Sequence, residues 1–221
     1  MKKIEAVLFD LDGVLVDTAK YHYLSWKSIA NKWDFKLTLA HNEKLKGVSR
    51  KDSLQKILDW AGATLLEKEM ERYLDVKNNM YLKHIAKLSQ DDLLPGVVKW
   101  LEYLKQNEIK IGLGSASKNA QLILEKLEIN PFFQTLVDGN HVSKGKPDPE
   151  VFLKGSHNLK VPPERCLVVE DSLAGVEAAH RAQMKTLAIG DAHQFQHADF
   201  CFSSLDAIEP AQLFSVIEFD K

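Results

Sequence analysis

One stretch decides the fold of this chain: Ile4-Glu5-Ala6-Val7-Leu8-Phe9-Asp10-Leu11-Asp12-Gly13. Residues 4–9 are mostly apolar, which is typical of a short buried strand. The strand is followed by a polar turn that contains Asp10, Asp12 and Gly13. In an open parallel sheet, ligands bind beyond the carboxyl ends of the strands. A sheet built around this strand would therefore place both carboxylates at its functional edge.

Residues 17–88 have the hydrophobic spacing of helices and contain no convincing strand. Apolar side chains recur at helical intervals in the segments 26–33, 54–61 and 70–85, and Gly62 ends the second of these segments. We therefore predict an all-helical insertion directly after the first strand.

From residue 94 onward, strand and helix patterns alternate, which is typical of a parallel sheet covered by helices on both faces. We predict an α/β fold with a core of residues 1–16 and 89–221, into which a helical domain of residues 17–88 is inserted. The later strands are predicted at residues 109–114, 135–137, 166–169 and 186–189, and the later helices around residues 98–104, 124–127, 151–152 and 174–182.

The composition is that of an ordinary globular protein, with 45% apolar and 27% charged residues among 221. A formal charge of -2 gives no electrostatic reason to expect a nucleic acid or an acidic membrane as a partner. No apolar stretch is long enough to span a bilayer, and the carboxylates after residue 9 interrupt the first apolar run too early for a secretory signal. Cys166 and Cys201 lie far apart and are expected to be free thiols. We expect a soluble cytoplasmic protein and, because its Lys- and Glu-rich helices give no sign of an obligate partner, a monomer.

Reactive side chains collect where the predicted strands end. Crowded carboxylates repel each other, and a hard cation such as Mg²⁺, which prefers oxygen ligands, compensates this repulsion. Such a cation also allows a carboxylate to approach an anionic phosphate. The candidates are Asp10 and Asp12 after the first strand, Ser115 after the strand at 109–114, Glu170 and Asp171 after the strand at 166–169, and Lys146 in a loop.

These residue types suit phosphoryl transfer with Asp10 as a covalent nucleophile. Asp12 can act as general acid and base, while Ser115 and Lys146 can hold phosphate oxygens. Taken singly, the same residues have structural explanations as turn formers, strand-end hydrogen bonders, surface charges and helix caps. Their joint order on alternating strands favours the functional interpretation.

Four motifs occur in order along the chain: Phe9-Asp10-Leu11-Asp12-Gly13-Val14, Gly114-Ser115-Ala116-Ser117, Lys146-Pro147-Asp148-Pro149 and Val169-Glu170-Asp171-Ser172. Together they resemble the haloacid dehalogenase superfamily of phosphotransferases, and the resemblance covers essentially the whole chain. It implies a Rossmann-like core with a helical cap inserted after the first motif, with Asp10 as nucleophile and Asp12 as acid and base. It also implies Mg²⁺ bound by Asp10, the main-chain carbonyl of Asp12, Glu170 and Asp171.

The helical insertion carries a second resemblance. Three stretches are similar to the β-phosphoglucomutase family: Asp17-Thr18-Ala19-Lys20-Tyr21-His22 with Trp26, Asn42-Glu43-Lys44-Leu45-Lys46-Gly47-Val48-Ser49-Arg50 with Asp52-Ser53-Leu54, and Ser115-Ala116-Ser117-Lys118-Asn119. Enzymes of that family interconvert β-glucose 1-phosphate and glucose 6-phosphate through a bound β-glucose 1,6-bisphosphate. The resemblance implies a phosphosugar substrate that contacts His22, Trp26, Leu45, Lys46, Gly47, Val48, Ser49, Arg50, Lys77, Ser115, Ala116, Ser117, Lys118 and Asn119.

A mutase must hold a second phosphate far from the nucleophile, and Arg50 suits this task because its planar guanidinium grips phosphate oxygens at two points. Structural alternatives remain for the cap: Trp26 can pack in a helical core, and Ser49 or Asp52 can cap a helix. Gly145 stands where Ser is frequent in that family, which leaves room for a different sugar phosphate.

The competing prediction is a phosphatase with the same four motifs, acting on a sugar phosphate or on phosphoglycolate. It would use Asp10 in the same way but admit water to the phosphoenzyme. Arg50 and Lys46 favour the mutase, because a simple phosphatase has no need of a distal phosphate clamp. A catalytically inactive binding protein is disfavoured because all the reacting groups are present.

Overall fold

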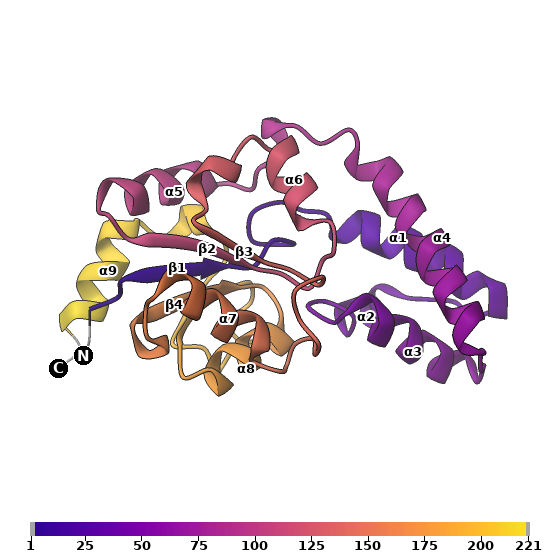
Figure 1. Ribbon diagram of the computed structural model, residues 1–221. Helices are drawn as coiled ribbons and strands as arrows, with labels where there is room; N and C mark the ends of the chain where they lie inside the picture. The colour runs from indigo at the N-terminus through magenta and orange to yellow at the C-terminus, as the bar shows by residue number, and fades with distance from the viewer. Residues whose placement is uncertain (1–2, 220–221) are drawn as a thin grey trace.

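The computed structural model describes residues 3–219, with side chains described up to residue 217. Figure 1 shows two lobes, an α/β lobe that contains both ends of the chain and a smaller lobe built only of helices. We call residues 17–88 the cap and the rest of the described chain the core. The boundaries at 16/17 and 88/89 are our proposal for the two domains.

In the described part of the chain, six strands form one sheet in the order β3-β2-β1-β4-β5-β6, and every neighbouring pair is parallel. This is the strand order of a Rossmann-like fold, as predicted. β1 lies at the centre, where Ala6 pairs with Lys110 of β2 and with Cys166 of β4. The strands are β1 (Ala6–Phe9), β2 (Lys110–Gly114), β3 (Thr135–Val137), β4 (Cys166–Glu170), β5 (Lys185–Ile189) and β6 (Phe200–Phe202).

Side chains of β1 alternate between two hydrophobic clusters, which explains why all four are buried. Val7 and Phe9 pack with side chains of α5, α6 and α9, whereas Ala6 and Leu8 pack with side chains of α7 and α8. The two groups of helices cover opposite faces of the sheet (Figure 1). Their bounds are α5 (Val97–Gln106), α6 (Ala120–Lys126), α7 (Glu150–Leu159), α8 (Leu173–Arg181) and α9 (Pro210–Phe219).

The cap contains α1 (Ala19–Ala30), α2 (Leu39–Glu43), α3 (Arg50–Ala61) and α4 (Glu67–Ile85), and its own hydrophobic cluster includes Trp26, Ile29, Leu54 and Ile57. Gly62 ends α3 in the left-handed conformation, as predicted. The two connections between cap and core run side by side, because Val16 forms a β-bridge with Leu93. The amide of Leu94 also donates to the carbonyl of Leu15 at 3.0 Å.

Two elements of the core were not predicted, the edge strand β6 and the last helix α9. The other strands lie within one or two residues of their predicted ranges, and the other helices overlap the predicted helical segments, except α2 of the cap, for which no range was predicted. Cys166 and Cys201 are free thiols, as expected. Within residues 3–219, no helix has both the length and the apolar character needed to cross a bilayer.

Candidate active site

The turn after β1 holds Asp10 and Asp12 against the end of β4. The Asp10 amide donates to the carbonyl of Val169 at 2.9 Å, and the Asp12 amide donates to Oδ2 of Asp10 at 3.0 Å. Gly13 has a φ of +87°, and a Cβ there would lie 2.1 Å from Oδ2 of Asp171. Only glycine therefore lets the turn approach Asp171 this closely.

Lys146 is the buried counter-ion of the nucleophile candidate. Its Nζ lies 2.5 Å from Oδ1 of Asp10 and 2.8 Å from Oε1 of Glu170. Although burial opposes it, the two carboxylates raise the pKa of Lys146 above its ordinary value. Burial, with a smaller contribution from Glu170, raises the pKa of Asp10 to about 6 against the opposing charge of Lys146. Asp10 is thus ionised at neutral pH and available as a nucleophile.

Three carboxylates form a cluster that fits a divalent cation. Oxygen atoms of Asp10, Glu170 and Asp171 all lie within 4.8 Å of one another. Burial and the neighbouring carboxylates raise the pKa of Asp171 well above its ordinary range, because the surrounding protein does not compensate the charge of a further ionised carboxylate. An all-oxygen donor set of this kind suits Mg²⁺.

Glu170 differs from the other two members of this cluster because its oxygens already have protein partners. The amide of Ser172 donates to Oε2 at 2.8 Å, and the Ser172 hydroxyl donates to Oε1 at 3.1 Å. The Ser172 hydroxyl in turn accepts from the amide of Gly175 at 3.0 Å and caps α8. Glu170 therefore ties the metal cluster to Lys146 and to the start of this helix.

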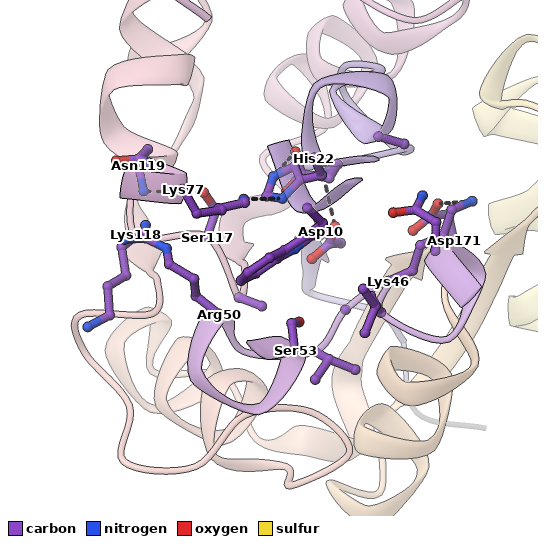
Figure 2. Close-up of a pocket in the computed structure, with 18 residues that line it drawn as sticks. Asp10, His22, Lys46, Arg50, Ser53, Lys77, Ser117, Lys118, Asn119 and Asp171 are labelled. Carbon is purple, nitrogen blue, oxygen red and sulfur yellow. Dashed lines mark hydrogen bonds and ion pairs between the residues drawn. The ribbon is translucent and has the colours of Figure 1, made fainter. Parts of the chain in front are cut away.

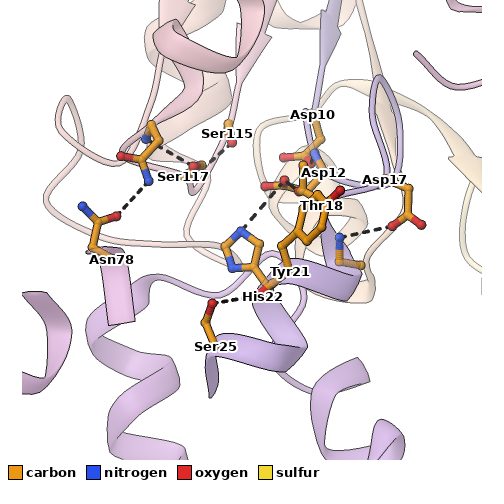
Figure 3. A network of polar contacts seen from close by, with 12 residues as sticks. Asp10, Asp12, Asp17, Thr18, Tyr21, His22, Ser25, Asn78, Ser115 and Ser117 are labelled. Carbon is orange, nitrogen blue, oxygen red and sulfur yellow. Dashed lines mark hydrogen bonds and ion pairs between the residues drawn. The ribbon is translucent and has the colours of Figure 1, made fainter. Parts of the chain in front are cut away.

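Asp12 points from the same turn toward the cap (Figure 3). Its Oδ1 accepts a hydrogen bond from the hydroxyl of Thr18 and lies 3.9 Å from Nε2 of His22. The side chain of Asp12 keeps 26% of its surface exposed. Burial of the rest and the charge of Asp10 raise the pKa of Asp12 to about 7. A carboxyl group with this pKa can both donate and accept a proton near neutral pH.

Lys77 carries a buried ammonium group from α4 to the pocket. Its Nζ lies 2.9 Å from Nδ1 of His22, and 4.9 Å and 4.7 Å from the ring centroids of Trp26 and Tyr81. Burial and the nearby charge of Arg50 lower the pKa of Lys77 to about 7. Burial and the charge of Lys77 lower the pKa of His22 well below its ordinary value, so His22 is a neutral imidazole.

Lys46 links the cap to the metal cluster. Its Nζ lies 3.4 Å from Oδ2 of Asp171 and 3.1 Å from Oε2 of Glu43. Burial alone would lower the pKa of Lys46, but Asp171 and Glu43 raise it. This ion pair joins the loop before α3 to the carboxyl end of β4.

Most of these groups line one pocket between the cap and the core (Figure 2). Of the residues named from the sequence, the structure brings the following to its wall: Asp10, Asp12, His22, Trp26, Leu45, Lys46, Gly47, Val48, Arg50, Lys77, Ala116, Ser117, Lys118, Asn119 and Asp171. Trp26 serves both interpretations, because it is buried in the cap cluster and also faces the pocket.

Four of the named residues lie outside the pocket wall. Ser49 caps α3, because its hydroxyl accepts from the Asp52 amide at 3.2 Å, as one structural alternative predicted. The buried Ser115 hydroxyl accepts from the Ser117 amide at 3.1 Å and so shapes the loop after β2. Lys146 lines a neighbouring cleft that shares Lys46 and Asp171 with the pocket. Glu170 is fully buried behind them.

The pocket also contains residues that were not named as candidates, namely Ala19, Asn42 and Ser53. All three lie inside stretches that carried the second resemblance, so the sequence did hold a signal for them. Thr18 lies in such a stretch too, but nothing in the spacing alone shows that its hydroxyl reaches Asp12.

A family model described as haloacid dehalogenase-like hydrolase matches residues 7–189, which includes all four motifs. The chain belongs to this family. The match extends across the cap and through β5, so the haloacid dehalogenase-like assignment covers most of the chain.

Relatives within this family have different activities. The chain is 43% identical to a β-phosphoglucomutase of Bacillus subtilis over 89% of its own length and 88% of that protein. It is 30% identical to a phosphorylated carbohydrates phosphatase of Thermotoga maritima, covering 83% of this chain and 84% of that one. The crystal structure of a β-phosphoglucomutase from Clostridium difficile superposes with a TM-score of 0.94 at 36% identity, covering 97% of this chain and 99% of that one. Membership of the haloacid dehalogenase-like family therefore does not decide between an isomerase and a phosphatase. The structure of the pocket has to distinguish these two activities.

Proposed function

We propose that this protein is a Mg²⁺-dependent phosphosugar mutase that interconverts β-D-glucose 1-phosphate and D-glucose 6-phosphate through an aspartyl-phosphate enzyme and a bound β-glucose 1,6-bisphosphate. One observation carries the proposal: a single pocket joins the nucleophile candidate to a second, cationic end. The similarity to β-phosphoglucomutases over nearly the whole chain supports the same assignment.

The cationic end of the pocket is formed by both lobes. Arg50 begins α3 in the cap, while Lys118 and Asn119 come from the core loop after β2. In Figure 2 these side chains lie on the opposite side of Asp10 from Lys46 and Asp171. The Arg50 guanidinium offers paired donors to a phosphate, and the ammonium group of Lys118 adds a second positive charge. A phosphomonoesterase needs only the end at Asp10, whereas a bisphosphate fills both ends.

In the proposed reaction, the aspartyl phosphate at Asp10 reacts first with β-glucose 1-phosphate: Asp12 takes the proton from the 6-hydroxyl, whose oxygen forms a bond to the phosphorus as the bond between phosphorus and Asp10 breaks. The product of this step is the bound bisphosphate. After the bisphosphate turns round, a carboxylate oxygen of Asp10 forms a bond to the phosphorus of the 1-phosphate as the bond to the sugar oxygen breaks, Asp12 gives its proton to that oxygen, and glucose 6-phosphate leaves with the aspartyl phosphate restored. The pKa of Asp12 near 7 suits both directions of proton transfer.

Other residues of the core hold the reacting groups in place. Lys146 keeps Asp10 oriented and offsets its charge, since its Nζ lies 2.5 Å from Oδ1. Mg²⁺ would be held by Asp10, the main-chain carbonyl of Asp12, Glu170 and Asp171, and when bound it would reduce the repulsion between the nucleophile and the phosphate. Ser115, at the end of β2, supports the loop that faces the phosphate.

The cap explains why the aspartyl phosphate would pass to a sugar rather than to water. Residues of α1, α3 and α4 line the pocket together with core residues, so the closed cap covers the nucleophile. A covered site excludes water from the phosphoenzyme. We further infer a cytoplasmic monomer with no nucleic-acid or membrane partner, in keeping with a net charge of -2.

A coupled assay tests the proposal. The protein receives β-glucose 1-phosphate, Mg²⁺ and a trace of the bisphosphate, and glucose 6-phosphate and inorganic phosphate are measured in the same reaction. We expect glucose 6-phosphate with little inorganic phosphate, and loss of both products in Asp10→Asn at unchanged melting temperature. Release of inorganic phosphate with little isomer would instead support the alternative, a phosphatase acting on sugar phosphates or phosphoglycolate, like the Thermotoga maritima relative.

Arg50 provides a sharper test of the cationic end. Arg50→Lys keeps the charge but removes the planar pair of donors, so we expect about a tenfold or greater loss of isomerisation. Hydrolysis of a small phosphomonoester with no second phosphate should remain unchanged. Arg72→Lys, at an exposed position on α4, is the matched control and should leave both activities intact.

A further inference from the structure

One hydrogen bond joins the cap to the phosphate-facing loop of the core. Nδ2 of Asn119 donates to Oδ1 of Asn78 at 2.9 Å, across the boundary between α4 and the start of α6. Both side chains are half-buried. Asn78 follows Lys77 on α4, so the same turn of this helix supplies a pocket residue and a contact to the core.

The backbone around Asn119 is held by the core alone. The amide of Asn119 donates to the Ser117 hydroxyl at 3.2 Å, and its carbonyl accepts from the Ile123 amide at 3.1 Å. On the other side of the loop, Nδ2 of Asn140 donates to the carbonyl of Lys118 at 3.0 Å. The core therefore fixes the path of the loop whatever the cap does.

The side chain of Asn119 is the part of this loop that the cap holds. It lines the pocket, and an unrestrained asparagine amide can rotate about its terminal torsion. The bond to Asn78 uses one of the two N–H groups of Asn119 and leaves the other available to a ligand. Because Asn78 belongs to the cap, this restraint exists when the cap sits against the core as described.

We propose that Asn78 is a positioning residue that orients the amide of Asn119 for the phosphate at the cationic end of the pocket. The inference rests on the proposed function, because it takes the second phosphate as the group that Asn119 meets. It adds a link between cap position and phosphate binding: closing the cap both covers the nucleophile and sets the Asn119 side chain.

The test uses variants at 78 and 119, alone and combined. Asn78→Ala should raise the KM for β-glucose 1-phosphate by about three- to tenfold, the size expected for one neutral hydrogen bond, with kcat changed less than about twofold. The matched control is Asn79→Ala, an exposed asparagine on the same helix, which should leave KM unchanged. In the Asn119→Ala background, Asn78→Ala should have no further effect.

Two results would overturn the inference. One is an unchanged KM in Asn78→Ala at normal melting temperature. The other is an equal rise in KM in the wild-type and Asn119→Ala backgrounds, which would mean that Asn78 does not act through Asn119. The proposed function is judged separately by the identity of the product, since consumption of the same substrate gives a KM whether isomer or inorganic phosphate forms.

Discussion

Lys77 holds its ammonium group in an environment with few compensating charges. It is 2% exposed, its Nζ contacts a neutral His22, and the positive charge of Arg50 lowers the pKa of Lys77 further. The negative charge of Asp12 raises the pKa of Lys77, but this effect is weaker than that of burial. The ring faces of Trp26 and Tyr81 supply part of the stabilisation that water would otherwise give.

The pKa of Lys77 makes the stability of the protein depend on pH in a defined direction. Its pKa falls from 10.5 to about 7 on folding, so the unfolded chain binds more protons between these values and stability rises with pH there. Lys77→Met should therefore stabilise the protein most below pH 7. Its advantage should shrink by up to about 1.4 kcal/mol per pH unit above that.

Chemical denaturation of wild type and variant across this pH range measures the difference. Lys83→Met, at an exposed position of the same helix, is the control and should show no such slope. If the difference in the free energy of unfolding between wild type and Lys77→Met stays constant with pH, the lowered pKa of Lys77 is contradicted.

At the scale of elements, the loop that delivers Lys146 is fastened by the first residue of α7. Glu150 accepts hydrogen bonds from the Ser143 amide at 2.9 Å, the Ser143 hydroxyl at 2.8 Å and the Lys144 amide at 2.9 Å. Lys154, one turn along the helix, donates to it at 2.7 Å. The negative charge at a helix N-terminus is also favourable.

These contacts lower the pKa of Glu150 from 4.5 to about 2, with Lys154 as the largest cause. Their contribution to stability is therefore complete above pH 4.5 and is lost as the pH falls toward 2. Glu150→Gln should melt at a lower temperature than wild type at pH 7, and the difference in melting temperature should be smaller at pH 3. Glu102→Gln, at an exposed position on α5, should melt like wild type at both pH values. An equal difference in melting temperature for Glu150→Gln at pH 7 and pH 3 would count against this role of the charge.

At the scale of the whole molecule, two glycines lie at close contacts between cap and core. A Cβ at Gly47 would lie 2.4 Å from the hydroxyl oxygen of Ser172. A Cβ at Gly145 would lie 3.0 Å from Cβ of Ser49 and 3.3 Å from its amide nitrogen. The loop before α3 is thus pressed against two parts of the core, the start of α8 and the loop that carries Lys146.

A side chain at position 145 should hold the lobes apart. We expect Gly145→Val to increase the ratio of inorganic phosphate to glucose 6-phosphate severalfold, because water would reach the phosphoenzyme. Adding Ser49→Gly removes the opposing Cβ and should restore part of the wild-type ratio. Glycine is also accepted at the N-terminal capping position of α3, so this second change should cost the helix little stability. An unchanged ratio in Gly145→Val would show that this contact does not control access of water.

The parts of the fold that the sequence predicted are those with strong local patterns. β1 is a continuous buried run that ends in two carboxylates, and the helices of the cap repeat at helical spacing. β6 escaped prediction because Phe200–Phe202 is only three residues long, half-buried and at the edge of the sheet. α9 escaped although Pro210 stands at its first position, where proline is a signal for the start of a helix.

The residues of the candidate site also differ in how far the sequence alone predicts them. Residues at strand ends could be assigned from topology, since parallel strands bring their carboxyl ends to one edge. The contacts of Thr18 with Asp12 and of Asn78 with Asn119 depend on how the cap lies on the core, which no local pattern contains. Lys146 was assigned to phosphate oxygens, and the structure adds its ion pairs with Asp10 and Glu170.

The paired connections at Val16 and Leu93 have a consequence for how such proteins can be rebuilt. The chain leaves the core at Val16 and returns at Leu93, and these two residues are joined by a β-bridge. With respect to the core, residues 17–88 are therefore equivalent to a long surface loop whose ends are adjacent. Lengthening or replacing a loop whose ends are already adjacent adds little closure entropy. Helical modules of other sizes could thus be transplanted at this junction, each bringing its own substrate preference, while the sheet and its carboxylates are inherited unchanged.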